Sequence, residues 1–179
     1  MHITRITGKD SQILAELAKQ TFLESHGHSA TPEDIHDYIA KTYNEDAILN
    51  EINDPGNLYY FIFKGERPAG FSKIVMNAPY PGSDINNIAK MDRFYLLKEF
   101  YNQNLGAVLF EFNMKLCREN NQKGVWLYVW TENDRAVRFY LKQGFRINGS
   151  HNFRISATHF NPNHLMLLIF EQTFVKEIQ

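Results

Sequence analysis

A turn between an expected strand at 91–97 and an expected helix from Leu105 has the chemistry to bind an anion. Residues 99–107 read EFYNQNLGA, a run rich in small and amide side chains. A helix that begins after such a turn gathers unpaired backbone N–H groups and the positive end of its dipole at one point, which suits a pyrophosphate. The turn lacks the Gly-Lys-Ser/Thr of a P-loop and the Gly-x-Gly-x-x-Gly of a dinucleotide site. Taken alone, it is equally well explained as an ordinary strand-to-helix turn.

A second segment runs from Asn133 to Phe145 and reads NDRAVRFYLKQGF. Asn133 suits the N-cap of a short helix, and Gly144 suits its C′ position. Together the two segments resemble the GNAT superfamily of N-acetyltransferases, whose second segment reads Asn-x-x-Ala-x-x-Phe-Tyr-x-x-x-Gly-Phe. That pattern is matched at every key position, namely Asn133, Ala136, Phe139, Tyr140, Gly144 and Phe145.

The first segment departs from the superfamily pattern Arg/Gln-x-x-Gly-x-Gly/Ala. Tyr101 stands at the Arg/Gln position and Asn104 at the first Gly position, whereas Gly106 fits. Asn tolerates a left-handed backbone, so Asn104 can preserve the conformation of the turn. Tyr101 offers one polar contact fewer to a phosphate than Arg or Gln would.

Over nearly the whole chain the resemblance is to the PaiA-type spermidine/spermine acetyltransferases of bacteria. It is carried by residues 21–22, 32–34, 38, 124–133 and 149–153. It implies acetyl-CoA as the donor and a primary amine as the acceptor, with polyamines favoured. The subgroup usually has an acidic residue just before the last strand, where this chain has His164.

The resemblance also assigns residues to the cofactor. Backbone groups of the strand would pair with the pantetheine arm, at Phe94, Tyr95 and Leu96. The amides of the turn would hold the pyrophosphate, at Tyr101, Asn102, Gln103, Asn104, Leu105, Gly106 and Ala107. Asn133 would contact the pantetheine, cap its helix, or do both.

Tyr140 is the predicted catalytic acid. Attack of an amine on a thioester expels a thiolate, and a phenol with a pKa near 10 can hydrogen-bond or protonate that sulfur as it leaves. Outside the matched motif, a core aromatic residue beside Phe139 would be the better interpretation.

The acceptor amine needs a route for its proton, because a nitrogen with a pKa near 10 arrives protonated. The candidates to take this proton are Asp92, Glu24, His26 and His151, of which Asp92 and His151 are predicted to be catalytic residues. Glu24 and His26 are predicted to line the acceptor site, because the first helices cap that site in the superfamily. Each of the four also has a structural alternative, and Asp92 could simply pair with Arg93 or a neighbour.

Neither a metal nor a covalent intermediate is predicted. His26 and His28 lie two apart without a cluster of cysteines or acids, which is a poor ligand set. Cys117 lies among helical apolar residues and is expected to be a buried thiol. A Cys-acyl intermediate would need a nearby base and an electropositive setting, so direct transfer in a ternary complex is favoured.

The elements that must position these residues can be read from periodicity and caps. Helical spacing follows Asp10, a candidate N-cap, and a second helix start is marked by Thr31-Pro32-Glu33-Asp34, with helical turns at 45–53. A hairpin is expected from strands at 58–63 and 69–77, a loop at 77–87, a strand at 91–97, a helix through 105–116 and a strand at 125–130. A helix at 133–143 and strands near 150–156 and 164–170 complete the order.

This order predicts an α/β (α+β) fold, a mixed and mostly antiparallel sheet of about six to seven strands flanked by helices. A parallel strand–helix–strand unit is expected at 91–130. The length of 179 residues suits one acyl-CoA N-acyltransferase domain over residues 1–179.

Composition narrows the class of protein. With 19 Lys+Arg against 20 Asp+Glu, the net charge of −1 disfavours nucleic-acid binding. A single cysteine excludes an intrachain disulfide, and neither a secretory signal nor a run of about 18 apolar residues is seen, so a cytoplasmic protein without membrane partners is expected. A homodimer stays open, because the aromatic run at 58–63 suits an interface as well as a core. Other open functions are transfer to a peptide N-terminus, an amino sugar or an antibiotic amine, and an idle acyl-CoA-binding regulatory module.

Overall fold

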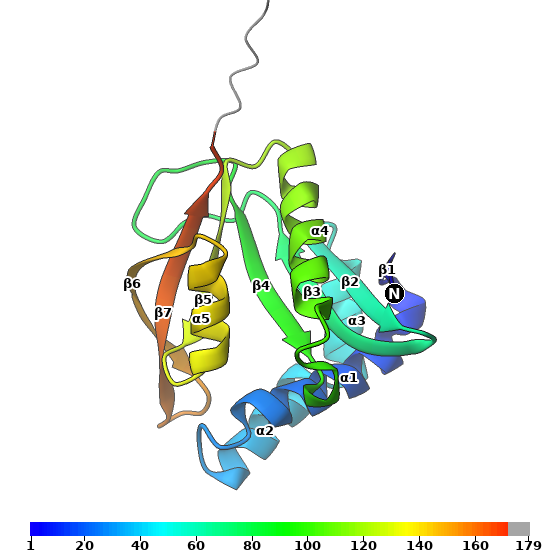
Figure 1. The fold of residues 1–179 in the computed structure, drawn as a ribbon. Coiled ribbons are helices and arrows are strands. Elements are labelled where there is room, and N and C mark those ends of the chain that lie inside the picture. The colour runs from blue at the N-terminus through cyan, green and yellow to red at the C-terminus, as the bar shows by residue number, and fades with distance from the viewer. Residues whose placement is uncertain (172–179) are drawn as a thin grey trace, which may run out of the picture.

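The computed structural model describes residues 1–171, which form one seven-stranded sheet with helices on both faces (Figure 1). The strands are β1 (His2–Arg5), β2 (Asn57–Lys64), β3 (Arg67–Val75), β4 (Ala89–Leu96), β5 (Gly124–Trp130), β6 (Arg146–Arg154) and β7 (Phe160–Ile169). Their order is β1-β2-β3-β4-β5-β7-β6, and every neighbouring pair is antiparallel except β4 and β5. The predicted fold class and its parallel unit are confirmed. Residues 172–179 of the predicted domain lie outside the described residues.

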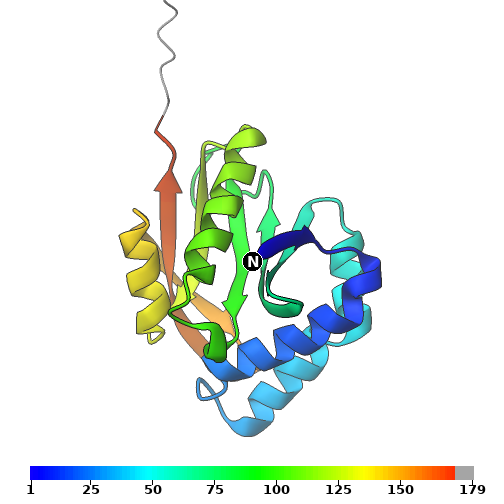
Figure 2. The same ribbon diagram turned by 45° about the vertical axis from the view of Figure 1, so that its right-hand side comes forward.

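The helices divide between the two faces of the sheet (Figures 1 and 2). They are α1 (Ser11–His26), α2 (Pro32–Thr42), α3 (Glu45–Asn53), α4 (Leu105–Glu119) and α5 (Asp134–Lys142). Tyr59 of β2 donates a hydrogen bond to Glu51 of α3, whereas the next residue, Tyr60, packs on Phe112 of α4 with ring centroids 4.7 Å apart. Successive strand residues point to opposite faces, so α3 and α4 cover opposite faces.

The neighbours of α3 and α4 complete the two layers. Phe22 of α1 packs on Tyr43, which lies between α2 and α3, and Phe139 of α5 packs on Phe110 of α4. The layer of α1 and α3 therefore lies on one face, and that of α4 and α5 on the other.

The predicted caps of two helices differ in outcome. Thr31 accepts a hydrogen bond from the Asp34 amide at 3.2 Å, as predicted for the start of α2. Asp10 directly precedes α1, but its carboxylate accepts from the amide and hydroxyl of Thr7 at 2.8 and 2.9 Å. The predicted position of Asp10 is confirmed, whereas its side chain closes the preceding turn instead of capping α1.

Two features of the sheet differ from a simple expectation. Strand β1 was not predicted from the sequence, because its four residues are too few to show the alternation of polar and apolar side chains that marks a strand. The aromatic run at 58–63 belongs to the core, since Tyr59, Phe61 and Ile62 are all at most 2% exposed. Its burial is explained by the helices that cover both faces of β2.

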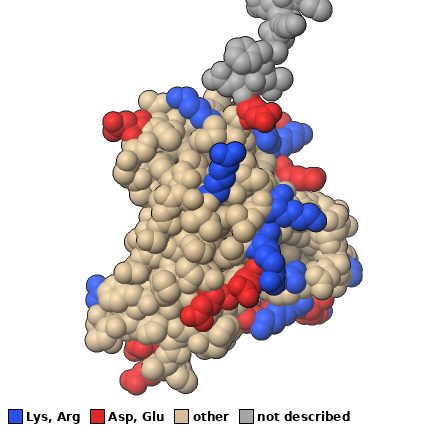
Figure 3. Space-filling view, turned by 60° about the vertical axis from the view of Figure 1, so that its left-hand side comes forward, with Lys and Arg blue, Asp and Glu red and all other residues tan. Residues whose placement is uncertain are grey.

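The surface carries charges of both signs. Figure 3, which views the molecule from the side of β6, shows Lys and Arg near Asp and Glu around a broad uncharged area. On this face the charges do not form the one-sided basic surface that is typical of nucleic-acid binding. Within residues 1–171, the helices fall short of the length and apolarity needed to cross a membrane.

Candidate active site

The sheet opens between its two parallel strands. β4 and β5 pair only at Ala89–Val125 and Lys90–Trp126, although β4 continues to Leu96 and β5 to Trp130. From residue 91 onward, the edge of β4 that faces β5 therefore has no strand partner. Its N–H and C=O groups are left to pair with an extended ligand.

The turn after β4 leaves its backbone N–H groups unused. Asn102 and Asn104 adopt left-handed backbone, with φ of 60° and 63°, so the prediction for Asn104 is confirmed. In the described part of the chain, the amides of residues 102–107 have no hydrogen-bond acceptor. A groove lies between β4, this turn and α5, and Gly106 lines it. A Cβ at Gly106 would come within 3.4 Å of Leu96. These amides and the start of α4 fit a pyrophosphate.

Helix α5 brings Tyr140 to the inner end of this groove. Asn133 accepts from the Ala136 amide at 3.2 Å and Gly144 has a φ of 91°, so both predicted helix ends are confirmed. Tyr140 is 7% exposed, and its hydroxyl has no hydrogen-bond partner among residues 1–171. Burial raises the pKa of Tyr140 well above its ordinary value, so the hydroxyl is protonated at neutral pH.

Three cations of α5 line the same groove. They follow helical spacing on one face of α5, at Arg135, Arg138 and Lys142. The Arg135 guanidinium lies 3.8 Å from the centre of the Tyr101 ring and donates to Asn102 at 3.3 Å. Within the described residues, none of the three cations forms an ion pair. The motif did not reveal them, although their spacing of i, i+3 and i+7 is visible in the sequence.

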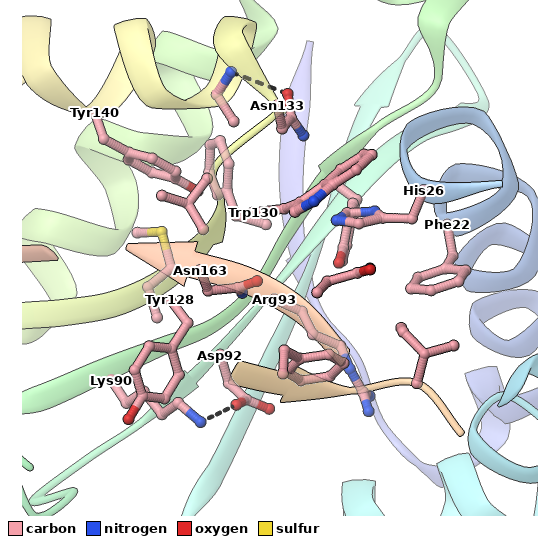
Figure 4. A pocket seen from close by; sticks show the side chains of 18 of the residues that line it. Phe22, His26, Lys90, Asp92, Arg93, Tyr128, Trp130, Asn133, Tyr140 and Asn163 are labelled. Atoms are coloured by element: carbon pink, nitrogen blue, oxygen red, sulfur yellow. Dashed lines mark hydrogen bonds and ion pairs between the residues drawn. The ribbon is translucent and has the colours of Figure 1, made fainter. Parts of the chain in front are cut away.

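A second cavity, the aromatic pocket, lies on the other side of Tyr140 (Figure 4). Its walls are mostly rings contributed by helices, strands and loops, namely Phe22, Tyr38, Tyr43, Tyr95, Tyr128, Trp130 and Phe153. Five residues line both the groove and the pocket, namely Phe94, Tyr95, Asn133, Ala136 and Tyr140. The two spaces therefore meet where β4 and β5 part, and Tyr140 stands at the junction.

The floor of the aromatic pocket is an alternating chain of five charges. Asp92 lies 2.6 Å from Lys90 and 3.0 Å from Lys73, while Glu51 lies 2.6 Å from Lys73 and 2.9 Å from Arg93. The chain thus runs Lys90–Asp92–Lys73–Glu51–Arg93, and three cations against two carboxylates leave one positive charge. The two lysines hold the pKa of Asp92 well below its ordinary range despite its burial.

A bulge in β4 explains why neighbouring charged residues face this pocket together. Lys73 of β3 is paired with Arg93, but the next residue, Ile74, is paired with Met91. Asp92 is therefore the extra residue of a β-bulge, which breaks the alternation of side chains. Asp92 and Arg93 both line the pocket as a result.

His26 lines the pocket opposite this floor, beside Trp130 (Figure 4). The Ser25 hydroxyl donates to the Thr21 carbonyl at 2.7 Å and lies 2.7 Å from His26 Nδ1. The Ser25 hydroxyl therefore contacts both the Thr21 carbonyl and the His26 ring. Burial, with the nearby His28, lowers the pKa of His26 to about 4, so the ring is neutral at neutral pH.

The sequence profile of the Acetyltransferase (GNAT) family matches residues 13–145, which include β4, α4, β5 and α5. The chain belongs to this family. It is an acetyl-CoA-dependent N-acetyltransferase, as the resemblance implied. An uncharacterized N-acetyltransferase of Lactobacillus delbrueckii subsp. lactis is 34% identical over 152 residues, which cover 84% of this chain and 87% of that protein.

Two more distant matches come from one organism, and one of them is named for its substrate. The spermidine N(1)-acetyltransferase of Thermoplasma acidophilum is 24% identical over 151 residues, covering 82% of this chain and 89% of that protein. The crystal structure of a PaiA N-acetyltransferase from the same organism, in complex with coenzyme A, superposes with a TM-score of 0.77. The superposition covers 94% of this chain and 98% of that chain, at 21% sequence identity. It shows that the two proteins share a fold.

The residues predicted for acetyl-CoA fall into two groups. Most line the groove, namely Phe94, Tyr95, Leu96, Tyr101, Asn102, Gly106, Asn133 and Tyr140. The side chains of Gln103, Asn104, Leu105 and Ala107 do not line it. Gln103 instead contacts Lys64 and the Glu99 carbonyl, and Leu105 is buried in the core. For these four, only the backbone can serve the predicted role.

The residues predicted for the acceptor are scattered. Asp92 and His26 lie in the aromatic pocket, whereas His151 and Glu24 do not line it. His151 is exposed and stacks on the Tyr128 ring at 4.3 Å. Glu24 accepts from the Lys98 amide at 2.7 Å, so its carboxylate secures the turn after β4. The geometry of His151 and Glu24 does not support the roles predicted for them.

Asp92 is also a poor general base in this setting. Its carboxylate is shared by Lys73 and Lys90, which stabilise the ionised form and make it a weak proton acceptor. The sequence alternative, in which Asp92 pairs with a neighbour, describes the observed contacts. His164, which replaces the acid of the PaiA-type pattern, points away from the pocket, since Asn161 and Asn163 line it and neighbours on a strand alternate.

Cys117 is fully buried on α4, as predicted. Burial raises the pKa of its thiol to about 12, so it is protonated at neutral pH. The thiol lines neither the groove nor the aromatic pocket.

Proposed function

We propose that this N-acetyltransferase acetylates a primary amine of a small molecule by direct attack in a ternary complex. The groove between β4, the turn at 101–107 and α5 would hold acetyl-CoA, and the aromatic pocket would hold the amine. Acetyl-CoA supplies an acetyl group activated as a thioester. The protein would bind and orient both partners and supply a proton at the junction.

The position of Tyr140 carries this proposal. It lines both cavities, and its hydroxyl is protonated without a partner in the described chain. A phenol there can donate a hydrogen bond to a sulfur that gains negative charge. Cys117 is protonated and lies outside both cavities, which supports direct transfer over an acyl-cysteine route.

The groove offers three kinds of contact to a coenzyme A molecule. The unpaired edge of β4 at Phe94 and Leu96 suits the amides of an extended pantetheine arm. The free amides of residues 102–107 suit the pyrophosphate. Arg135 lies over Tyr101, at the position where the superfamily pattern has Arg or Gln, so α5 supplies the cation that the turn lacks.

The proton of the amine would leave to water. An ammonium group with a pKa near 10 is about six units above the pKa of His26, so complete transfer to His26 would cost about 8 kcal/mol. Asp92 is weaker still as a base. The one excess positive charge of the floor disfavours an ammonium ion, so the pocket itself would lower the pKa of the bound amine.

A polyamine is the first acceptor to test, because a relative at 24% identity is named for spermidine. The pocket gives this acceptor little support. Its one lining carboxylate, Asp92, already pairs with two lysines.

The test is an assay of thiol release from acetyl-CoA with a panel of amines that includes spermidine. Tyr140→Phe and Tyr128→Phe provide matched variants, one at the junction and one at the wall of the pocket. Turnover that depends on Tyr140 far more than on Tyr128 is expected. Binding of coenzyme A without turnover of any amine would contradict the proposal.

A further inference from the structure

We propose that the acceptor is a primary amine that also carries a carboxylate, and that Lys90 binds this carboxylate. Amino acids and short peptides belong to this class. The inference rests on the proposed function, because it names the substrate of the same site.

The charges that line the aromatic pocket carry the argument. Lys90, Asp92 and Arg93 line it, and Lys73 and Glu51 lie directly behind them. Both carboxylates of this chain sit between two cations, whereas each cation at its ends contacts one carboxylate within residues 1–171. An anionic group added at one end would complete the alternation and neutralise the excess charge.

Lys90 is the end of the chain that a ligand can reach. Its ammonium group has three donors, and in the described chain one of them meets Asp92 Oδ1. The side chain is 26% exposed and lies over the rings of Trp126 and Tyr128 at 5.1 and 5.6 Å. These rings limit its motion without occupying its donors.

Arg93, at the other end, is held more tightly. It is 10% exposed, donates to the Tyr59 hydroxyl at 2.6 Å and to Glu51 at 2.9 Å, and lies over the Tyr43 ring. Its charge contributes to the field of the pocket, whereas its position is fixed by the protein. The direct contact to a ligand is therefore assigned to Lys90.

The remaining lining residues agree with an acceptor of this kind. His26 is neutral at neutral pH, so it adds no charge to the count. The rings of Phe22, Trp130 and Phe153 suit an apolar or aromatic body between the amine and the carboxylate. A polyamine would instead bring two or more positive charges to a floor that already has one in excess, which is unfavourable.

The experiment compares pairs of amines in which one member carries a carboxylate and the other the corresponding carboxamide. We would measure kcat/KM by thiol release for phenylalanine and for ω-amino acids from glycine to 6-aminohexanoate, each against its carboxamide, with spermidine alongside. The series of chain lengths identifies the distance between amine and carboxylate that the pocket accepts. For the best pair, the carboxylate member is expected to be at least about tenfold better, as for a hydrogen bond between charged groups.

Lys90→Gln should bring this ratio close to one by lowering kcat/KM for the carboxylate member alone. Lys115→Gln, at an exposed position of α4, should leave the ratio unchanged. Equal rates within every pair, a ratio that survives in Lys90→Gln, or a better rate with spermidine than with every carboxylate would each overturn the inference. In those cases the proposed N-acetyltransferase would still stand.

A second measurement separates the two proposals when no amine is turned over. Calorimetric titration of the protein–coenzyme A complex with each pair tests the carboxylate site directly. Tighter binding of the acids, lost in Lys90→Gln, would support the inference even if the proposed reaction failed. Equal binding of acids and carboxamides would overturn it.

Discussion

The groove beside α5 and the aromatic pocket both carry excess positive charge, but they hold it in different ways. In the groove, Arg135, Arg138 and Lys142 are exposed and have no carboxylate partner among the described residues. In the pocket, the cations are fixed in an alternating chain with Asp92 and Glu51. Exposed cations without a carboxylate partner are free to pair with a polyphosphate, whereas cations fixed in a chain of ion pairs favour a ligand group at one position.

The backbone shows the same contrast. The groove offers main-chain groups, at the open edge of β4 and in the turn at 102–107, and these recognise a ligand whatever the side chains are. The pocket is lined mostly by aromatic and charged residues. A cofactor shared by a whole family suits the first kind of site, and an acceptor that varies between enzymes suits the second. Tyr140 lines both the groove and the pocket.

The largest expected effect concerns Tyr140, which lines both the groove and the aromatic pocket. Tyr140→Phe should lower kcat/KM by about 100-fold, because a positioned acid contributes about this much or more. Coenzyme A affinity should stay within about twofold, since the ring remains in place. Thiol release and calorimetry measure the two quantities, and Tyr128→Phe serves as the control. Equal activity of both variants would remove Tyr140 from the chemistry.

A second prediction concerns His26, which lines the aromatic pocket. The pKa of His26 is about 4 in the folded protein and near 6.5 when unfolded. Between these values the unfolded chain binds more protons, so stability falls as the pH falls. From pH 7 to pH 5 this histidine should remove about 2 kcal/mol from the free energy of unfolding.

His26→Gln should flatten this part of the pH dependence, and denaturant unfolding at the two pH values measures it. His36→Gln, on the exposed side of α2, is the matched control. The window lies above the ordinary pKa values of Asp and Glu, so the acidic groups contribute little. An unchanged slope in His26→Gln would show that the ring is hydrated.

A third prediction concerns the exposed cations of the groove. Arg135→Gln should weaken coenzyme A binding about tenfold, because a charge-assisted contact is lost near Tyr101. Added salt should narrow the difference from wild type, since exposed charges are screened. Calorimetry at two salt concentrations measures this, with Lys41→Gln of α2 as the control. A loss that does not depend on salt would place Arg135 among the fixed charges instead.

The sequence predicted the groove far better than the pocket. The groove is built from short continuous segments, 94–96, 101–107 and 133–140, whose residues keep their order in space. A motif can therefore describe it. The cations of α5 were missed because they lie at motif positions that allow any residue.

The pocket could not be predicted because it depends on contacts between distant segments. Glu51 meets Arg93 only through the packing of α3 on the sheet, and His26 at the end of α1 lies beside Trp130 at the end of β5. The bulge at Asp92 changes which side chains share a face, and no single residue type signals it. A shift of one position also separates His164 from the pocket that Asn163 lines.

The smallest expected effect tests whether the turn at 101–107 works through its backbone. Asn104 has a φ of 63°, so Asn104→Ala should lower the free energy of unfolding by about 1 kcal/mol, whereas Asn104→Gly should not.

Asn121 provides a matched control, because it has a φ of 56° and lies outside the groove. Asn121→Ala should cost a similar stability without weakening coenzyme A binding. Asn104→Ala should weaken that binding as well, because strain relief in the turn would move the amides that Asn104 now holds in place. If both alanine variants bind coenzyme A as well as wild type, the left-handed turn serves the fold alone and the cations of α5 carry the recognition of the phosphates.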